Sequence, residues 1–414
     1  DGLTLGLSAA HLRLLRKHAL GPGRERRPLL ITWTTGGEKY LNLALNLALS
    51  VRKNAPALVD QFVCVALDRA AYRSMQRQKF NAVLHPVDHH SEGSLKDAIW
   101  KMRWLILRTL SRMGINVLVV DSDLVVLGDP FQVLHGDSDL EVMTDHFFPD
   151  RHLWQYWARP EEHINTGFIF VRASPRVEAF LTEFLEEHVE PSIDGILRHW
   201  MDQQVFNKFV MRRMHHAESD EVHGLYGQQL FRNFRAKSKA ERPIRIRILD
   251  PVVVAHGMNY FWLRAHEGLP GDPSTVKQPV VAHANGVDGK EYFLRDRGHW
   301  YIDDFSQRFS GAHFLTYEHP MGLSLKEDFE HLVAAMVVAK ALGRRLVLPG
   351  TMNCENCPAL HAYKANSTLR SRACTFDYFA WSQSFLNFHG DLVVESGLSR
   401  NRHFRKLSSR ELTT

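Results

Sequence analysis

Two carboxylates separated by a single residue stand directly after an apolar run. Asp121 and Asp123 flank Ser122 and follow residues 115–120, whose sequence is INVLVV. Divalent cations such as Mg²⁺ and Mn²⁺ prefer oxygen ligands, often one or two carboxylates together with substrate phosphates. A cation held there neutralises the charge that develops on a pyrophosphate leaving group. The pattern therefore predicts a metal-assisted site at the end of a strand, suited to breaking a sugar–phosphate bond.

The surroundings of these carboxylates favour a buried site over the alternative, a solvated turn that contains Asp-X-Asp by chance. Apolar residues border the acids on both sides in the sequence VLVVDSDLVVL. A third ligand is needed, and His283 at the end of PVVAH is the best candidate. A neutral imidazole suits Mn²⁺ better than Mg²⁺. The alternative for His283 is an ordinary histidine at a strand end.

Strand and helix patterns alternate around this motif. Apolar, β-branched runs predict strands, and apolar residues at a spacing of three and four predict helices. The early β-loop-α-β order is typical of a parallel α/β sheet. The predicted strands are residues 29–34, 61–68, 115–120, 139–145, 166–173, 244–254 and 279–283, and the predicted helical stretches are 40–54, 96–113 and 176–213.

A second, smaller unit is predicted after residues 303–311. Ser324 and Glu327 form a capping box that opens a helix to Ala341, between strand-like residues 313–320 and 344–349. This order predicts a small βαβ unit. The expected organisation is an N-terminal lead-in (1–28), a main α/β domain (29–303) and an accessory C-terminal unit (312–414).

Composition and net charge limit the classes of partner that the chain is expected to bind. The 414 residues are 44% hydrophobic and 23% charged, as in a globular protein, and the formal net charge of +5 is too small to indicate nucleic-acid binding. The sequence contains no apolar run of about 18 residues that would span a membrane. Because the chain opens at Asp1 without Met, we expect a lumenal fragment whose membrane anchor is absent from this sequence.

Three cysteines and a glycosylation sequon gather near the C-terminus. Asn366 begins an Asn-Ser-Thr sequon beside the cysteines, which favours an oxidising compartment such as the lumen of the secretory pathway or the Golgi. A disulfide from Cys374 to Cys354 or Cys357 is predicted. Zinc binding completed by His361 or His389 is the alternative.

Four segments of the chain resemble glycosyltransferase family 77, the plant and algal nucleotide-diphospho-sugar transferases. INVLVVDSDLVVLGDPF resembles its Asp-X-Asp region, and HINTGFIFVRAS its Asn-Thr-Gly-Phe strand. WMDQQVFNKFV resembles the start of its Asp-Gln helix, and HANGVDGKEYFLRDRGHW its C-terminal His-Asn motif. The four segments occur in the family's order within residues 29–302.

The resemblance implies a GT-A fold, a Rossmann-like mixed sheet with flanking helices. It also implies a UDP-sugar donor, Mn²⁺ or Mg²⁺, and retention of anomeric configuration. The family's activities include arabinosyl, galactosyl and xylosyl transfer to proteins or polysaccharides. Two departures, Gly286 and Val119-Val120 in place of the family's aromatic residues, bear on the choice of donor.

The resemblance also implies roles for individual residues. The metal ligands would be Asp121, Asp123 and His283. The residues near the transferred sugar would be Asn165, Asp202 and Gln203, with Asp202 supplying the carboxylate on the sugar's far face. The donor-binding residues would be Thr34, Thr35, Lys101, Asp121, Ser122, Thr166, Gly167, Asn285, Gly286 and Lys290.

Several alternatives stay open. Asp202 is also explained as an acid that favours the positive end of a helix dipole, and Lys290 as a solvated lysine. For the whole chain, the first alternative is an inactive scaffold that binds nucleotide or sugar. The second is a nucleotidyltransferase that makes the nucleotide sugar. The short sequence Thr34-Thr35-Gly36-Gly37-Glu38 argues against the second, because it lacks the arginine of that class's phosphate loop.

Overall fold

The structure, a computed structural model, describes most of the chain in two units. The first comprises residues 1–147, 154–256 and 278–283, and the second 148–153, 257–277 and 284–414. The described residues are 7–21, 25–86, 95–145, 164–189, 202–223, 229–238, 243–262, 264–267, 273–287, 289–304, 308–318, 320, 323–349, 352–353, 373–374 and 392–394.

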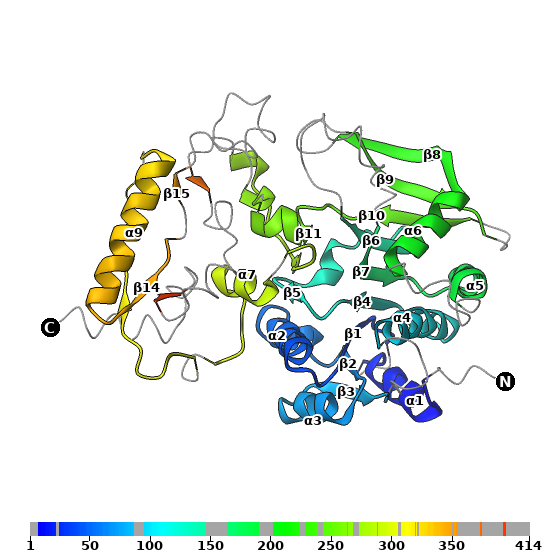
Figure 1. The fold of residues 1–414 in the computed structure, drawn as a ribbon. Helices are drawn as coiled ribbons and strands as arrows, with labels where there is room; N and C mark the ends of the chain where they lie inside the picture. The colour runs from blue at the N-terminus through cyan, green and yellow to red at the C-terminus, as the bar shows by residue number, and fades with distance from the viewer. Residues whose placement is uncertain are drawn as a thin grey trace. The chain divides into compact units, whose positions relative to one another are not determined.

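A nine-stranded mixed sheet forms the centre of the first unit (Figure 1). Its order is β3-β2-β1-β4-β7-β6-β10-β9-β8. The strands β3, β2, β1 and β4 are parallel, whereas β7 runs antiparallel to both β4 and β6. The bounds are β1 (Leu29–Thr34), β2 (Phe62–Ala66), β3 (Asn81–Leu84), β4 (Val117–Val120), β6 (Leu140–Thr144), β7 (Ile164–Val171), β8 (Met214–His223), β9 (Gln229–Ala236) and β10 (Ile244–Ile248).

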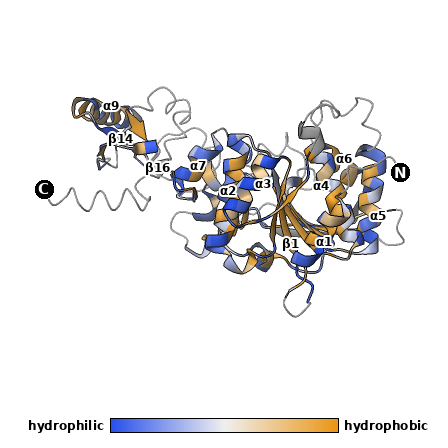
Figure 2. Cartoon of the chain, turned by 90° about the horizontal axis from the view of Figure 1, so that it is seen from below, coloured by the Kyte–Doolittle hydropathy of each residue, from blue (hydrophilic) through white to orange (hydrophobic). Residues whose placement is uncertain are grey.

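Helices cover both faces of this sheet, because successive side chains of its strands point to opposite faces. Ile31 of β1 packs in the core with α1 (Ala9–His18), α4 (Leu95–Arg112), α5 (Pro175–Phe184) and α6 (Asp202–Arg213). Leu30 packs in the opposite core with α2 (Glu38–Asn54) and α3 (Arg69–Arg77). Figure 2 shows the resulting pattern, with apolar strands between helices that carry polar outer residues.

A three-stranded sheet in the same unit brings distant residues together. It consists of β11 (Val254–His256), β12 (Val281–His283) and β5 (Leu124–Val126). β5 follows β4 almost directly, and its antiparallel register with β12 pairs Leu124 with His283. Ser50 Oγ accepts a hydrogen bond from Val126 N at 2.9 Å and so fixes β5 against α2.

The second unit contains a parallel sheet of β13 (Phe314–Leu315), β14 (Arg345–Val347) and β17 (Val393–Val394). β13 and β14 are joined by α9 (Leu325–Ala341), which begins with the expected capping box of Ser324 and Glu327. The unit's other elements are α7 (Lys290–Asp296), β15 (Met352–Asn353) and β16 (Ala373–Cys374). Short 3-10 or π-helices across the two units are Pro56–Leu58, Pro130–Val133, Leu185–Val189, Met258–Trp262, Ala265–Glu267 and Pro273–Thr275.

The fold class expected from the sequence is confirmed: a mixed α/β sheet with flanking helices, and a small C-terminal βαβ unit. The domain boundaries remain predictions. Cys354, Cys357 and Asn366 lie outside the described residues, and only the backbone of Cys374 is described, so the disulfide, zinc and glycosylation assignments also remain predictions. In the described part of the chain, no helix is long and apolar enough to cross a bilayer.

An aromatic cluster between α4, α5 and α6 gives a test of the packing. Phe206 is fully buried and stacks on Trp104 with ring centroids 4.4 Å apart. We expect Phe206→Ala to lower the free energy of unfolding by about 3–5 kcal/mol, because it removes buried contacts and leaves a cavity. Urea unfolding measures this change. Tyr40→Ala, at a side chain that is 55% exposed, is the control and should cost less than about 0.5 kcal/mol. Equal losses in the two variants would contradict the packing.

Candidate functional site

The turn between β4 and β5 carries the two carboxylates that the sequence singled out. Asp121 follows the last residue of β4, and its backbone N–H donates to the carbonyl oxygen of Gly167 at 2.9 Å. Leu124, the first residue of β5, donates its N–H to the carbonyl oxygen of Asp121 at 3.3 Å. Asp121, Ser122 and Asp123 are therefore held in a tight connection between two sheets.

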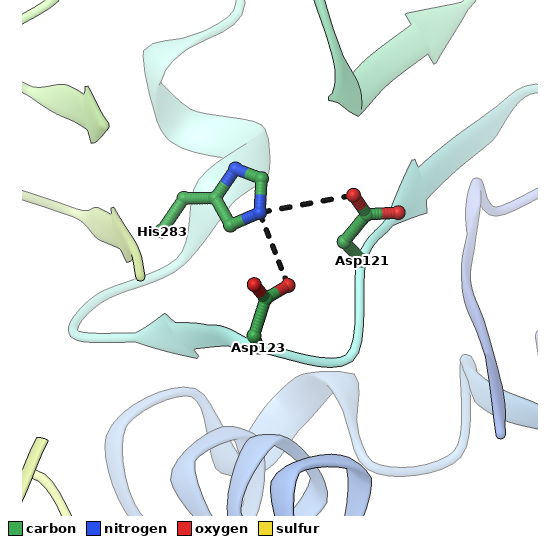
Figure 3. Close-up of side chains that lie close together, drawn as sticks. All are labelled: Asp121, Asp123 and His283. Carbon is green, nitrogen blue, oxygen red and sulfur yellow. Dashed lines mark hydrogen bonds and ion pairs between the residues drawn. The ribbon is translucent and has the colours of Figure 1, made fainter. Parts of the chain in front are cut away.

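Asp121, Asp123 and His283 converge from this turn and from β12 (Figure 3). The Nε2 atom of His283 lies 3.1 Å from Asp123 Oδ1 and 3.7 Å from Asp121 Oδ2. One ligand atom from each residue lies within 4.8 Å of the others. Asp123 and His283 are buried, whereas the Asp121 side chain is 30% exposed. Two carboxylate oxygens and one imidazole nitrogen fit a divalent cation that is approached from the side of Asp121.

Gly167 of β7 leaves room for this convergence. A Cβ atom built on Gly167 would lie 2.2 Å from His283 Cε1, 2.7 Å from Asp121 Oδ2 and 2.8 Å from Asn165 Oδ1. Contacts below 3.0 Å are essentially never found for real Cβ atoms. Glycine is therefore required here for space, and the triad would not fit around any larger residue.

Arg103 of α4 holds the other side of Asp121. Its guanidinium donates to Asp121 Oδ1 at 2.5 Å and to the carbonyl oxygen of Thr166 at 2.9 Å. Its side chain is only 4% exposed and its Cζ lies 4.8 Å from the centre of the Trp33 ring. Asp121 Oδ1 thus contacts the buried Arg103 guanidinium, and Asp121 Oδ2 lies near the Nε2 atom of His283. Charge-assisted bonds of this kind are roughly twice as strong as neutral ones.

Asn165 and Gln203 form a hydrogen-bonded group with Asp145, which directly follows β6. Asn165 Nδ2 donates to Asp145 Oδ1 and Gln203 Nε2 donates to Asp145 Oδ2, each at 2.5 Å. The carbonyl ends of the two amides accept backbone N–H groups of Gly167 at 2.7 Å and Thr166 at 3.3 Å. The Asn-Thr-Gly motif and Gln203 therefore meet in one group, beside Asp121 and His283.

Thr34 and Thr35 lie at the carboxyl end of β1, which is parallel to β4 and adjacent to it. Both threonines are buried, and Thr34 Oγ1 donates to the carbonyl oxygen of Thr35 at 3.1 Å. The next residue, Gly36, donates its N–H to the carboxylate of Asp68, which also caps α3. Since parallel neighbours end at the same edge of a sheet, the threonines lie at the same edge as Asp121.

The remaining predicted site residues lie on other elements of the two units. Lys101 of α4 is half-buried. Asp202 begins α6, but its side chain lies outside the described residues. Asn285, Gly286 and Lys290 belong to the second unit, where Asn285 Oδ1 accepts from the N–H of Gly257 at 3.0 Å and Lys290 begins α7. Their roles remain predictions.

Two charged residues of the site were missed by sequence reasoning. Arg103 stands in the apolar helical stretch WKMRWLILRTL, where a buried arginine calls for an anionic partner. Asp145 ends the strand DLEVMTD, and an acid at the carboxyl end of a predicted strand was the signal that could have identified it.

Comparison with known proteins gives a family and distant relatives. Residues 57–294 match the family described as nucleotide-diphospho-sugar transferase. A UDP-galactose:fucoside alpha-3-galactosyltransferase of Dictyostelium discoideum is 26% identical over 211 residues, which are 50% of this chain and 28% of that protein. Arabinosyltransferase RRA2 of Arabidopsis thaliana is 37% identical over 59 residues, 14% of each chain. The matches thus span less than a third of either relative.

Solved structures of low similarity are also found. A galactosyltransferase, LgtC, in complex with donor and acceptor sugar analogs is 14% identical and has a TM-score of 0.40, with 67% of this chain and 99% of that chain covered. Mouse xyloside xylosyltransferase 1 is 12% identical with a TM-score of 0.34, covering 63% of this chain and 98% of that chain.

The crowding at Gly167 gives a direct test of the metal site. We expect Gly167→Ala to abolish Mn²⁺ binding, because its methyl group occupies the space of His283 and Asp121. Binding is measured by titration calorimetry or by the electron paramagnetic resonance of free Mn²⁺. Gly128→Ala is the matched control, since its Cβ would meet only Val280 at 3.7 Å and 3.8 Å. Unchanged Mn²⁺ affinity in Gly167→Ala would show that the triad is not the metal site.

Proposed function

We propose that this chain, which belongs to the family of nucleotide-diphospho-sugar transferases, transfers a sugar from a UDP-sugar to a hydroxyl group in a reaction that requires a divalent cation. As a member of the family, the protein is a glycosyltransferase with a nucleotide-sugar donor. The proposal adds the cation, the uridine diphosphate and retention of anomeric configuration. The observation that carries it is the convergence of Asp121, Asp123 and His283 at the end of β4.

The metal ligands follow from this convergence. Asp123 Oδ1, Asp121 Oδ2 and His283 Nε2 are the atoms that face one another. Mn²⁺ is proposed over Mg²⁺ because one of the three donors is an imidazole nitrogen. When bound, the cation supplies charge neutralisation for the diphosphate leaving group. Arg103 keeps Asp121 in place through Oδ1 and leaves Oδ2 directed at the ligand cluster.

The donor is proposed to lie along the edge formed by the carboxyl ends of β1 and β4 and the amino end of β7. Thr34, Thr35 and Ser122 are assigned to the nucleotide, and Lys101 to the diphosphate. Asn165, Thr166, Gly167 and Gln203 are assigned to the sugar, and they are supported by their contacts beside the triad. Asp202 is proposed as the carboxylate on the far face of the sugar. Asn285, Gly286 and Lys290 remain assigned to the donor on the resemblance alone.

The transferred sugar is proposed to be galactose, arabinose or xylose. Relatives of this chain are named as galactosyl- and arabinosyltransferases, and the family resemblance adds xylose. The acceptor is proposed to be a hydroxyl group of a protein or glycan. The Golgi or secretory lumen is the proposed location.

Release of UDP tests the reaction without knowledge of the acceptor, because water can take its place. The protein is incubated with UDP-galactose, UDP-arabinofuranose or UDP-xylose and Mn²⁺, with and without EDTA. We expect release from one donor, its loss in EDTA, and a fall of about 100-fold or more in Asp123→Asn, which removes a metal ligand. Asp129→Asn, which changes a carboxylate that caps Phe131 N outside the triad, should retain activity.

Each competing function gives a different result. Binding of UDP and Mn²⁺ without release from any donor would replace the transferase with a binding scaffold. Pyrophosphate formed from a nucleoside triphosphate and a sugar phosphate would identify a nucleotidyltransferase. UDP release that EDTA does not affect would contradict the proposed requirement for a divalent cation. The configuration of the sugar in the product, determined by NMR, decides between retention and inversion.

A further inference from the structure

β7 separates from β6 next to the metal triad. Val142 pairs with Ile169, but the next residue, Met143, pairs with Asn165. Three residues of β7, from Thr166 to Phe168, therefore face no partner on β6. On its other side β7 remains paired with β4 up to the bond from Asp121 N to the carbonyl oxygen of Gly167. Bulges of this kind are over-represented next to active sites.

Side-chain amides accept two backbone N–H groups of this stretch. The N–H of Gly167 donates to Asn165 Oδ1 at 2.7 Å, and the N–H of Thr166 donates to Gln203 Oε1 at 3.3 Å. Buried backbone N–H groups need such acceptors. Asn207, one turn after Gln203 on α6, pairs with both backbone polar groups of Ile164 at 2.9 Å and 3.0 Å. The helix that carries Gln203 is thereby fixed to the start of β7.

The opposite ends of both amides meet the carboxylate of Asp145. Asn165 Nδ2 faces one oxygen and Gln203 Nε2 faces the other. An ionised carboxylate only accepts hydrogen bonds, and a backbone N–H only donates. The orientation of each amide is thus fixed by two hydrogen bonds: its nitrogen donates to Asp145, and its oxygen accepts a backbone N–H of the bulge. Neither amide can turn over without placing two donors or two acceptors against each other.

We propose that Asp145 is a positioning residue that fixes the orientation of the Asn165 and Gln203 amides for the transferred sugar. Each amide carries two N–H groups in one plane. When Asp145 takes one N–H, the direction of the other is fixed. Asn165 Oδ1 is among the nearest atoms to a Cβ built on Gly167, together with atoms of His283 and Asp121. The oriented amide therefore stands beside the metal ligands, where hydroxyl groups of a bound sugar need defined donors.

Asp145→Asn tests this role, because it replaces one acceptor oxygen with an NH₂ group that opposes an amide donor. We expect kcat to fall by about 100-fold, as for small misplacements of a catalytic arrangement, while the Kd of UDP with Mn²⁺ stays unchanged. Hydrogen exchange of the peptide 164–171 should become about tenfold faster at Thr166 and Gly167, whose acceptors are displaced.

Asp139→Asn is the matched control. Asp139 directly precedes β6, as Asp145 directly follows it, and accepts bonds from Arg176 and from the N–H of Arg245. Its loss should affect thermal stability without the specific change at Thr166 and Gly167. If Asp145→Asn does not fold, Asp145→Ser, which is smaller and offers a single acceptor oxygen, is measured in the same way and should show the same two changes.

The inference rests on the proposed function for its sugar, but the exchange measurement does not. Unaltered exchange at Thr166 and Gly167 in the Asp145 variants would overturn it. So would a loss of kcat without any change in exchange, which would make Asp145 a direct participant, or a parallel loss of UDP affinity, which would make its role structural. If the wild-type protein releases no UDP but exchange responds as expected, the proposed function fails while the control of the amides by Asp145 stands.

Discussion

The negative charge of two aspartates at the carboxyl end of buried β4 governs the arrangement of the site. Asp121 and Asp123 follow apolar β4, and an uncompensated buried carboxylate costs several kcal/mol. Arg103 reaches Asp121 from α4, and His283 reaches Asp123 from β12. Each compensating group arrives on a different element, so the positions of α4 and β12 relative to β4 must be maintained for both contacts to form. The two packed faces of the large sheet supply that rigidity.

A second constraint is the short stretch of β7 that has no partner on β6. The bulge allows Gly167 to approach the triad, but the N–H groups of Thr166 and Gly167 find no strand acceptor on β6. Asn165 and Gln203 supply acceptors in its place, and Asp145 orients both. Close packing at the metal site and polar compensation beside it are therefore consequences of a single departure from regular strand pairing.

Local patterns predicted the parts of the fold that depend on local chemistry. The strand before Asp121 and the long α4 formed within two residues of the expected bounds, and the capping box of Ser324 formed as expected. His283 lies beside Asp123 as the sequence led us to expect, although the residues are 160 positions apart, because one ends an apolar strand and the other closely follows one. Arg103 and Asp145 were not found, since their roles depend on pairings that no local pattern contains. The register shift after Val142 places its extra residues on β7, where Gly167 is the local signal that could have indicated a bulge.

The space at Gly167 also provides a way to tell active members of the family from inactive ones. A chain of this family that retains both aspartates and the histidine satisfies every test based on charged ligands. A methyl group at the position of Gly167 would nevertheless occupy the volume in which those ligands meet. The residue at the position of Gly167 is thus a more sensitive marker of a lost metal site than the aspartates are. A survey of related sequences that reads this position would identify inactive members that the Asp-X-Asp motif alone would count as enzymes.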